Sequence, residues 1–222
     1  MKAELIESVD AEALKQKLIE KYRLHYEREG IHLTDLLGCM RKSYYNKTAF
    51  LPPSDSTIWN FVTGLALQEV LIQDEEVVFL TEGDIVLSVD GFTQLGNIKE
   101  LKTTTKREKS LNKDILEDQL EGKSAGWLKQ IMGYCAQLRI NKALLLVLSM
   151  SIPKELYSYK IEFEKGELQE MRDYLAWRGK ELNGALEMGI VPAKEENWFC
   201  KDCQYSTQCD MDSRCDVVEE GE

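Results

Sequence analysis

The stretch Ile98-Lys99-Glu100-Leu101-Lys102-Thr103 has the composition of a strand and carries a carboxylate and an amine two positions apart. Side chains at positions i and i+2 of a strand point to the same face, so Glu100 and Lys102 are predicted to project side by side. An isolated Glu-x-Lys pair is most often an ordinary ion pair on a solvated strand. The apolar neighbours Ile98 and Leu101 weigh modestly against that alternative.

A second acidic residue, Asp84, stands at the start of another predicted strand. A turn at Asp90-Gly91 is predicted to join the two strands as a hairpin and to bring Asp84 toward Glu100. Two carboxylates that converge need a counter-charge, or one of them is protonated. Mg²⁺ or Mn²⁺ supplies that charge through oxygen ligands. Lys102 would then orient an attacking water or stabilise a charged phosphate.

The rest of the chain alternates between helical and strand periodicity. Helices are predicted at 10–30, from Thr34 through Tyr44, and at 58–72, 126–139 and 167–188, and strands at 77–80, 84–89, 97–103, 143–149 and 156–163. This order indicates an α/β or α+β fold. We expect one domain over residues 1–222. It has a helical N-terminal part (1–75), a sheet core (76–165), and a C-terminal helix followed by a cysteine-bearing tail (166–222).

The composition describes an acidic chain of 222 residues with a formal net charge of −11. Such a charge argues against non-specific binding to a polyanion, although a small basic site can still lie on an acidic body. Five basic residues fall between Lys99 and Lys109, and Arg41-Lys42 forms a second cluster. No stretch has the roughly 18 apolar residues of a membrane span, and the N-terminus does not resemble a signal peptide. We expect a cytoplasmic protein.

Three of the six cysteines form a close run in the tail, Cys200-x2-Cys203-x5-Cys209. Such spacing in a chain without an export signal indicates a metal site. A zinc or iron–sulfur site normally takes four ligands, and neither histidine lies in the tail. The fourth ligand is therefore a cysteine. Cys39 and Cys215 both remain open, Cys135 is expected in the core, and ligand type does not choose between zinc and iron.

The helix predicted at 126–139 carries Gln130 and Tyr134 on one face, because they are four residues apart. Together they could hold a phosphate or a base near a metal. An ordinary amphipathic helix with a half-buried tyrosine explains the same pattern.

In combination these motifs resemble the RecB-like PD-(D/E)XK nucleases, and among them the CRISPR-associated exonuclease family Cas-four. The resemblance spans roughly residues 33–210. Its elements are Leu37-Gly38-Cys39-Met40-Arg41, Tyr44-Tyr45, Gly83-Asp84-Ile85, the Glu100 strand, Gln130-x3-Tyr134 and the cysteine run of the tail. It implies an α/β fold with a mixed central sheet flanked by helices.

The resemblance also implies cofactors. A 4Fe-4S cluster would be ligated by one upstream and three downstream cysteines, which selects Cys39, Cys200, Cys203 and Cys209. Mg²⁺ or Mn²⁺ would be bound by Asp84, Glu100 and the Leu101 carbonyl. Lys102 would be the catalytic lysine, and Gln130 and Tyr134 would position the strand.

The activity implied is that of an exonuclease on single-stranded DNA ends, which trims spacer precursors together with the integrase proteins Cas-one and Cas-two. The same module also occurs in repair and mobile-element nucleases. One position departs from the family, because Gln68 stands where a metal-binding histidine is usual; its amide oxygen can still bind Mg²⁺, so Gln68 is counted with the metal ligands. A catalytically weakened DNA-end-binding or adaptor module is therefore a second hypothesis, and a zinc-knuckle binding protein is a third.

Overall fold

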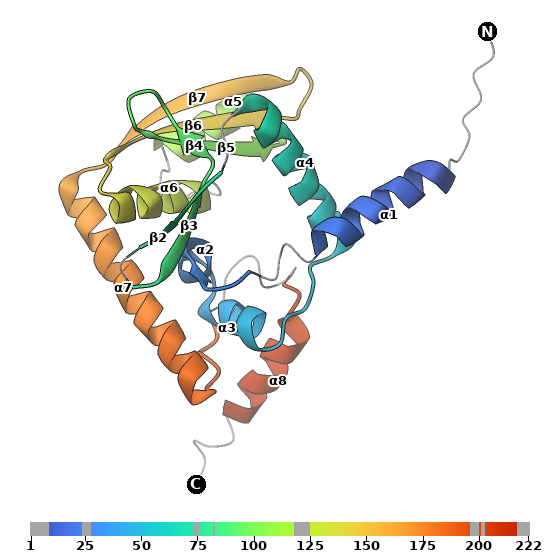
Figure 1. The fold of residues 1–222 in the computed structure, drawn as a ribbon, viewed down its shortest axis with the longest axis vertical. Helices are drawn as coiled ribbons and strands as arrows, with labels where there is room; N and C mark the ends of the chain where they lie inside the picture. The colour runs from blue at the N-terminus through green and yellow to red at the C-terminus, as the bar shows by residue number, and fades with distance from the viewer. Residues whose placement is uncertain are drawn as a thin grey trace.

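The chain folds into two small sheets flanked by helices, an α/β architecture (Figure 1). The computed structural model describes residues 9–23, 28–72, 76–81, 83–117, 125–195, 200 and 203–216. In these ranges no helix is both long and apolar enough to cross a membrane.

A four-stranded sheet in the order β4-β5-β6-β7 carries Glu100 and Lys102. Its strands are β4 (Gly91–Phe92), β5 (Ile98–Thr104), β6 (Lys142–Ser149) and β7 (Glu155–Glu162). Every second residue of β6 from Ala143 onward is buried, as expected for a strand with one face on the core. The pairs at both edges of the sheet are antiparallel, whereas β5 and β6 run parallel and need a crossover connection.

The crossover supplies the helix that covers this sheet. It contains α5 (Glu108–Asn112), a π-helical turn η2 (Lys113–Glu117) and α6 (Ala125–Leu138). α6 packs against β5, β6 and the long α7 (Lys165–Met188). α7 begins with a capping box, in which the Glu167 carboxylate accepts a hydrogen bond from the Glu164 amide, and it ends at Gly189 with a left-handed φ of 68°.

The second sheet has three strands in the order β1-β3-β2. β3 (Ile85–Val89) lies between β1 (Ile31–His32), which is parallel to it, and β2 (Val77–Leu80), which is antiparallel. Only Asp90 separates β3 from β4. One continuous stretch of chain therefore leaves the three-stranded sheet and enters the four-stranded sheet at Asp90.

The predicted hairpin between residues 84–89 and 97–103 is thus wrong in its pairing and its turn. β3 pairs with β1 and β2, while β5 pairs with the two-residue β4. The tight turn lies at Thr93–Asn97, where the Thr93 amide donates to the Asn97 carbonyl and Gly96 has a φ of 75°. The reason is burial: Val89 and Gly91 on either side of Asp90 are both buried, so this dipeptide continues the strand instead of turning into solvent.

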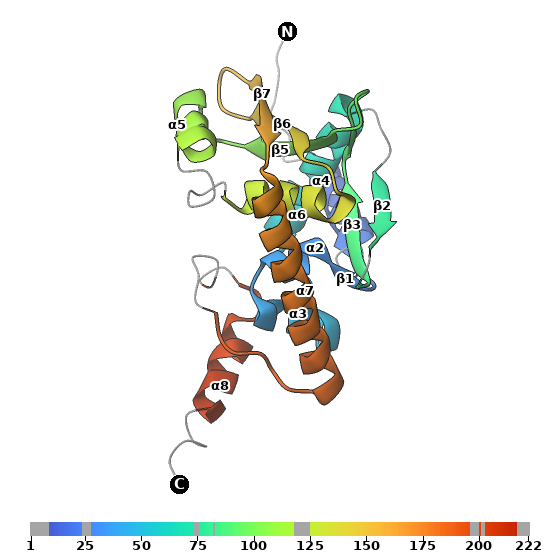
Figure 2. The ribbon, with the colours of Figure 1, turned by 90° about the vertical axis from the view of Figure 1, so that its left-hand side faces the viewer.

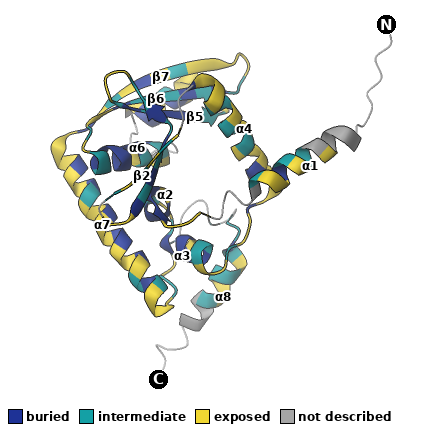
Figure 3. Ribbon diagram, in the orientation of Figure 1, coloured by how far each residue is buried: buried dark blue, intermediate teal, exposed yellow. Residues whose placement is uncertain are grey.

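Two helices stand beside the sheets and are paired with each other, α1 (Val9–Arg23) and α4 (Asp55–Leu71). Ser54 is the N-cap of α4, and its hydroxyl accepts a hydrogen bond of 3.3 Å from the Thr57 amide. Although α4 is rich in apolar residues, Ile58 is its only buried residue, and much of the helix is exposed (Figure 3). One side of α4 is therefore available to line a cavity next to the sheets.

α2 (Leu33–Leu37) and α3 (Met40–Thr48) of the N-terminal part lie beside the C-terminal helices α7 and α8 (Ser206–Asp216), as both ribbon views show (Figures 1 and 2). α2 and α3 pack against α7, and the cysteine tail ends in α8, which carries Cys209. The Tyr205 hydroxyl donates to Asn46 at 2.8 Å and accepts from the Leu51 amide at 3.0 Å, and the Tyr45 hydroxyl donates to Asp212. These contacts fix the tail on α3.

Candidate metal centre

β5 presents Glu100 and Lys102 on one face, beside α6. Glu100 is 2% exposed, and its Oε1 accepts a hydrogen bond of 2.7 Å from the Lys102 ammonium. The same ammonium donates to Gln130 Oε1 at 3.0 Å. The two side chains therefore form an oriented and partly buried ion pair, with the carboxylate buried and the lysine half-buried, and not a solvated surface pair.

The second oxygen of Glu100 is unusual. Among the residues that the structure describes, Oε2 is the one buried side-chain oxygen or nitrogen without a hydrogen-bond partner. Burial raises the pKa of the Glu100 carboxyl to about 7, although the Lys102 ammonium opposes this rise. An unsatisfied buried oxygen is costly, and a cation bound to it would remove the cost and lower the pKa again.

Asp90 provides the second carboxylate of the site. It lies at the bend between β3 and β4, and its Oδ2 accepts a hydrogen bond of 2.8 Å from the Leu101 amide. Burial raises the pKa of Asp90, and the negative charge of Asp90 in turn raises the pKa of Glu100. The two carboxyl groups therefore face a common space that disfavours two uncompensated charges.

Asp84 does not take part in this arrangement, contrary to the sequence-based prediction. It is exposed, lies in the turn before β3 with a φ of 58°, and does not line the cavity that holds Glu100. Alternation along β3 does not separate the two aspartates, because Ile85, Leu87 and Val89 face the core and the even positions face the cavity. The difference lies in the turn: Asp84 precedes β3 with a left-handed φ, at the end of the strand opposite to Asp90.

Gln130 and Tyr134 hold the lysine in place. The Gln130 amide donates to the Tyr134 hydroxyl at 2.7 Å, and that hydroxyl donates to the Ser88 carbonyl at 2.5 Å. Burial, followed by the charge of Glu100, raises the pKa of Tyr134, so the phenol stays protonated. A hydrogen-bonded chain thus runs from Glu100 through Lys102 and α6 to β3.

These residues line one cavity of about 730 Å³. Gln68 lines it from α4, one helical turn after Gly64, and Leu101, Glu76 and Phe61 also contribute to its wall. In the described ranges no three His, Cys, Asp or Glu residues lie close enough to hold a metal ion by themselves. Two carboxylates and the Gln68 amide oxygen suit Mg²⁺ or Mn²⁺, which keeps several sites for water and phosphate.

The four cysteines predicted to bind a cluster lie at the start of α3 and in the C-terminal tail. Cys39 caps α3, and Cys200, Cys203 and Cys209 come from the tail that packs on α3. No disulfide involves any of these four, and they do not converge on a single-ion site in the part of the chain described.

A buried arginine joins the two cysteine-bearing segments. The Arg41 guanidinium donates to the Cys209 carbonyl at 3.2 Å and to the Pro192 carbonyl at 2.6 Å. Cys135 is separate from this group: it is buried in α6, and burial raises the pKa of its thiol to about 12. The side chain of Cys215 lies outside the described residues.

Comparison with solved structures shows the fold. SSO0001 is similar at a TM-score of 0.57 and 20% identity, with 92% of this chain and 98% of that chain covered. The alkaline exonuclease LHK-Exo from Laribacter hongkongensis gives 0.48 at 10% identity, with coverages of 76% and 95%. Its complex with dAMP also gives 0.48, at 11% identity. No protein-family model matches the sequence, and no curated protein matches it.

The likeness to SSO0001 extends over nearly the whole length of both chains, so the two proteins share one overall fold. It is an α/β fold with mixed sheets and helices.

Proposed function

We propose that the chain is a divalent-metal-dependent exonuclease that hydrolyses phosphodiester bonds at single-stranded DNA ends. The observation that carries this proposal is the buried Glu100 carboxylate, with one oxygen held by Lys102 and the other without a partner. Asp90 on the neighbouring bend, the Gln68 amide and the Leu101 carbonyl would complete the protein ligands. The proposal replaces Asp84 by Asp90 as the aspartate ligand.

Each residue of the site has a chemical task. Asp90 and Glu100 would hold the metal, which when bound would polarise the phosphoryl oxygen and lower the pKa of the attacking water. Lys102 has three N–H donors, of which two are directed to Glu100 and Gln130. The third is left for a phosphate oxygen or for the attacking water. Gln130 and Tyr134 keep the ammonium in place, which makes them positioning residues.

We further propose a 4Fe-4S cluster on Cys39, Cys200, Cys203 and Cys209. In such a cluster each thiolate binds a different iron, so the four sulfurs need not meet at one point as they must around zinc. The packing of the tail on α3 and the absence of disulfides among the four fit this donor set. The cluster would be structural.

For the biological setting we propose the trimming of spacer precursors in CRISPR adaptation, with Cas-one and Cas-two as partners. This proposal rests on the motif around Cys39 and Arg41 and on the cysteine run of the tail. The same site would equally serve a nuclease of DNA repair or of mobile elements. A weakened, DNA-end-binding form is favoured by one observation, the neutral Gln68 in the wall of the metal centre.

The decisive experiment compares the natural protein with Glu100→Gln on end-labelled single-stranded DNA, in Mn²⁺ and in Mg²⁺. The substitution keeps the shape of the side chain and removes its charge, and the amide oxygen can still accept the hydrogen bond from Lys102, so the fold should be retained. We expect cleavage to be lost while DNA binding persists. Full cleavage by Glu100→Gln would refute the nuclease site, and DNA binding without cleavage by the natural protein would support the adaptor function.

A further inference from the structure

A group of basic and polar side chains lines the same cavity on elements that carry none of the metal ligands. Arg28 lies just before β1, His32 ends β1, and Thr34 lies in the first turn of α2. Arg28 Nη2 donates to the Thr34 hydroxyl at 3.2 Å. All three face the cavity that also contains Glu100 and Lys102.

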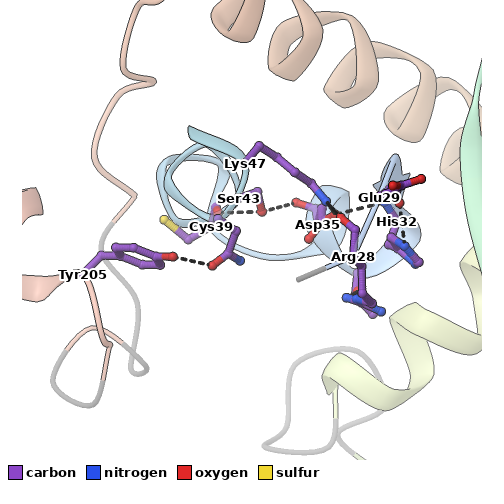
Figure 4. A network of polar contacts seen from close by, with 10 residues as sticks. Arg28, Glu29, His32, Asp35, Cys39, Ser43, Lys47 and Tyr205 are labelled. Atoms are coloured by element: carbon purple, nitrogen blue, oxygen red, sulfur yellow. Dashed lines mark hydrogen bonds and ion pairs between the residues drawn. The ribbon is translucent and has the colours of Figure 1, made fainter. Parts of the chain in front are cut away.

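A network of hydrogen bonds holds this segment in place (Figure 4). The His32 amide donates to Asp35 Oδ2 at 2.9 Å, and the His32 ring is 3.0 Å from the Glu29 carbonyl. The Lys47 ammonium of α3 lies 3.4 Å from the Asp35 carboxylate and donates to the Arg28 carbonyl at 3.0 Å. The backbone that presents Arg28 is therefore fixed to α3.

Close packing fixes the same segment from the other side. Leu33 of α2 lies against Gly133 of α6, where an added Cβ would come within 2.9 Å of a Leu33 methyl carbon. A side chain larger than hydrogen at position 133 would push α2 away from α6. The distance between the Thr34 segment and the helix that carries Gln130 is thus set by a direct contact.

Arg28 places a positive charge at this corner of the cavity, whose wall also contains Glu76. Asp35 is matched by Lys47, whereas Arg28 has no carboxylate partner within the described parts of the chain. Burial and then the Arg28 charge lower the pKa of His32. Lys47 also lowers this pKa, whereas Asp35 raises it. The ring is consequently neutral near pH 7, and an anion beside it would favour its protonation.

We propose that Arg28, Thr34 and His32 form an anion subsite that holds a phosphate of the DNA strand other than the one being hydrolysed. The guanidinium fork matches two phosphate oxygens, the hydroxyl supplies a further donor, and the imidazole gains a donor as it protonates. A cavity of about 730 Å³ lies within the range of ordinary ligand sites. The proposal rests on the proposed function, since it assumes that the neighbouring carboxylates act on a phosphodiester.

Binding can be tested without any cleavage. The chain has two histidines, His25 and His32, so proton NMR of the full chain resolves the His32 ring once His25→Gln has identified the other signal. The protein is titrated with pH in the presence and absence of inorganic phosphate, with no divalent metal added. We expect phosphate to raise the pKa of His32 in the natural protein. The matched control Lys180→Gln, which removes an exposed lysine of α7, should behave like the natural protein, whereas Arg28→Gln should abolish the response.

No rise with phosphate, or the same rise in Arg28→Gln, would overturn the subsite. Because this experiment needs neither metal nor turnover, an inactive protein would not affect its result. A failure of the nuclease proposal is therefore distinguishable from a failure of the subsite.

Kinetics then identify which phosphate is held. Oligonucleotides with a 5′-phosphate, with a 3′-phosphate or with neither are cleaved by the natural protein, Arg28→Gln and Lys180→Gln. Loss of a charge-assisted hydrogen bond should raise KM about tenfold in Arg28→Gln. A rise confined to one phosphorylated end assigns the subsite to a terminal phosphate, and an equal rise for all substrates assigns it to an internal one. A KM equal to that of Lys180→Gln on every substrate would contradict the proposal.

Discussion

The Asp90 carboxylate accepts a hydrogen bond of 2.8 Å from the Leu101 amide, across the junction where one strand passes between the two sheets. This contact fixes Asp90 beside the residue that follows Glu100 along β5. It also orients the carboxylate through one oxygen and leaves its second oxygen available to a cation. The geometry of the metal centre thus depends on the backbone at this bend.

Asp90→Asn should remove metal-dependent cleavage, and Asp84→Asn is the matched control. Loss of residues that merely orient a metal ligand costs about 10- to 100-fold in activity, so loss of a ligand should cost about a hundredfold or more. Asp84 is exposed and outside the cavity, so Asp84→Asn should retain the natural rate. Cleavage rates in Mn²⁺, with Mn²⁺ affinity measured in parallel, check this. Loss of cleavage in Asp84→Asn with a natural rate in Asp90→Asn would show that Asp84, and not Asp90, is the metal ligand.

The stability of the metal-free protein should fall as the pH rises from about 4.5 to above 7. The folded state raises the pKa of Glu100 from 4.5 to about 7, so it binds more protons than the unfolded chain in this window. Relative to its value below pH 4.5, the free energy of unfolding should therefore be lower by ~2–4 kcal/mol once the pH is above 7. Urea unfolding at pH 5 and pH 8 measures it. Glu100→Gln should flatten this dependence, and Mg²⁺ should restore stability at pH 8; an equally steep profile in the variant would assign it to other groups.

Gln68→His should strengthen Mn²⁺ binding and raise Mn²⁺-supported cleavage, with a smaller effect in Mg²⁺. The side chain already lines the cavity, and imidazole nitrogen favours Mn²⁺ and later metals more than an amide oxygen does. Titration of Mn²⁺ with parallel cleavage assays measures both effects. Gln94→His places a histidine in the exposed β4–β5 turn and controls for non-specific binding. Unchanged Mn²⁺ affinity in Gln68→His would mean that the metal does not contact position 68.

Cys39→Ser should bleach the visible absorption of the anaerobically purified protein and lower its solubility as much as Cys203→Ser does. The two residues lie on segments that the Arg41 and Tyr205 contacts hold together. Cys135→Ser should keep the absorption, because that thiol is buried in α6, and Cys215→Ser should keep it as well. Bleaching by Cys215→Ser but not by Cys39→Ser would show a local knuckle in the tail.

The sequence predicted those parts of the fold and site that depend on local periodicity. The strands and long helices lie close to where hydrophobic spacing places them, and the rule that residues i and i+2 share a face puts Glu100 beside Lys102. The i, i+4 rule likewise puts Gln130 beside Tyr134, and in the structure the two are hydrogen-bonded and Gln130 also accepts from Lys102.

The errors came from features that local patterns do not determine. Asp90-Gly91 has the composition of a hairpin turn, but burial on both sides keeps it in a strand that changes sheets. Alternation along β3 places Asp84 and Asp90 on one face alike, so the pattern alone did not choose between them. Arg28 and His32 gave no such signal, because they lie before and at the end of a strand of only two residues whose partner, β3, lies far along the chain.

The bond from Arg41 to Cys209 spans 168 residues of sequence, and the guanidinium that makes it is 1% exposed. During synthesis the N-terminal helices therefore leave the ribosome long before the segment that satisfies this buried cation. Until then Arg41 must stay hydrated, and α3 cannot take its final place without stranding a charge. Synthesis of the cysteine tail is in this way a condition for the final placement of α3, which delays maturation of the site until α8 has been made.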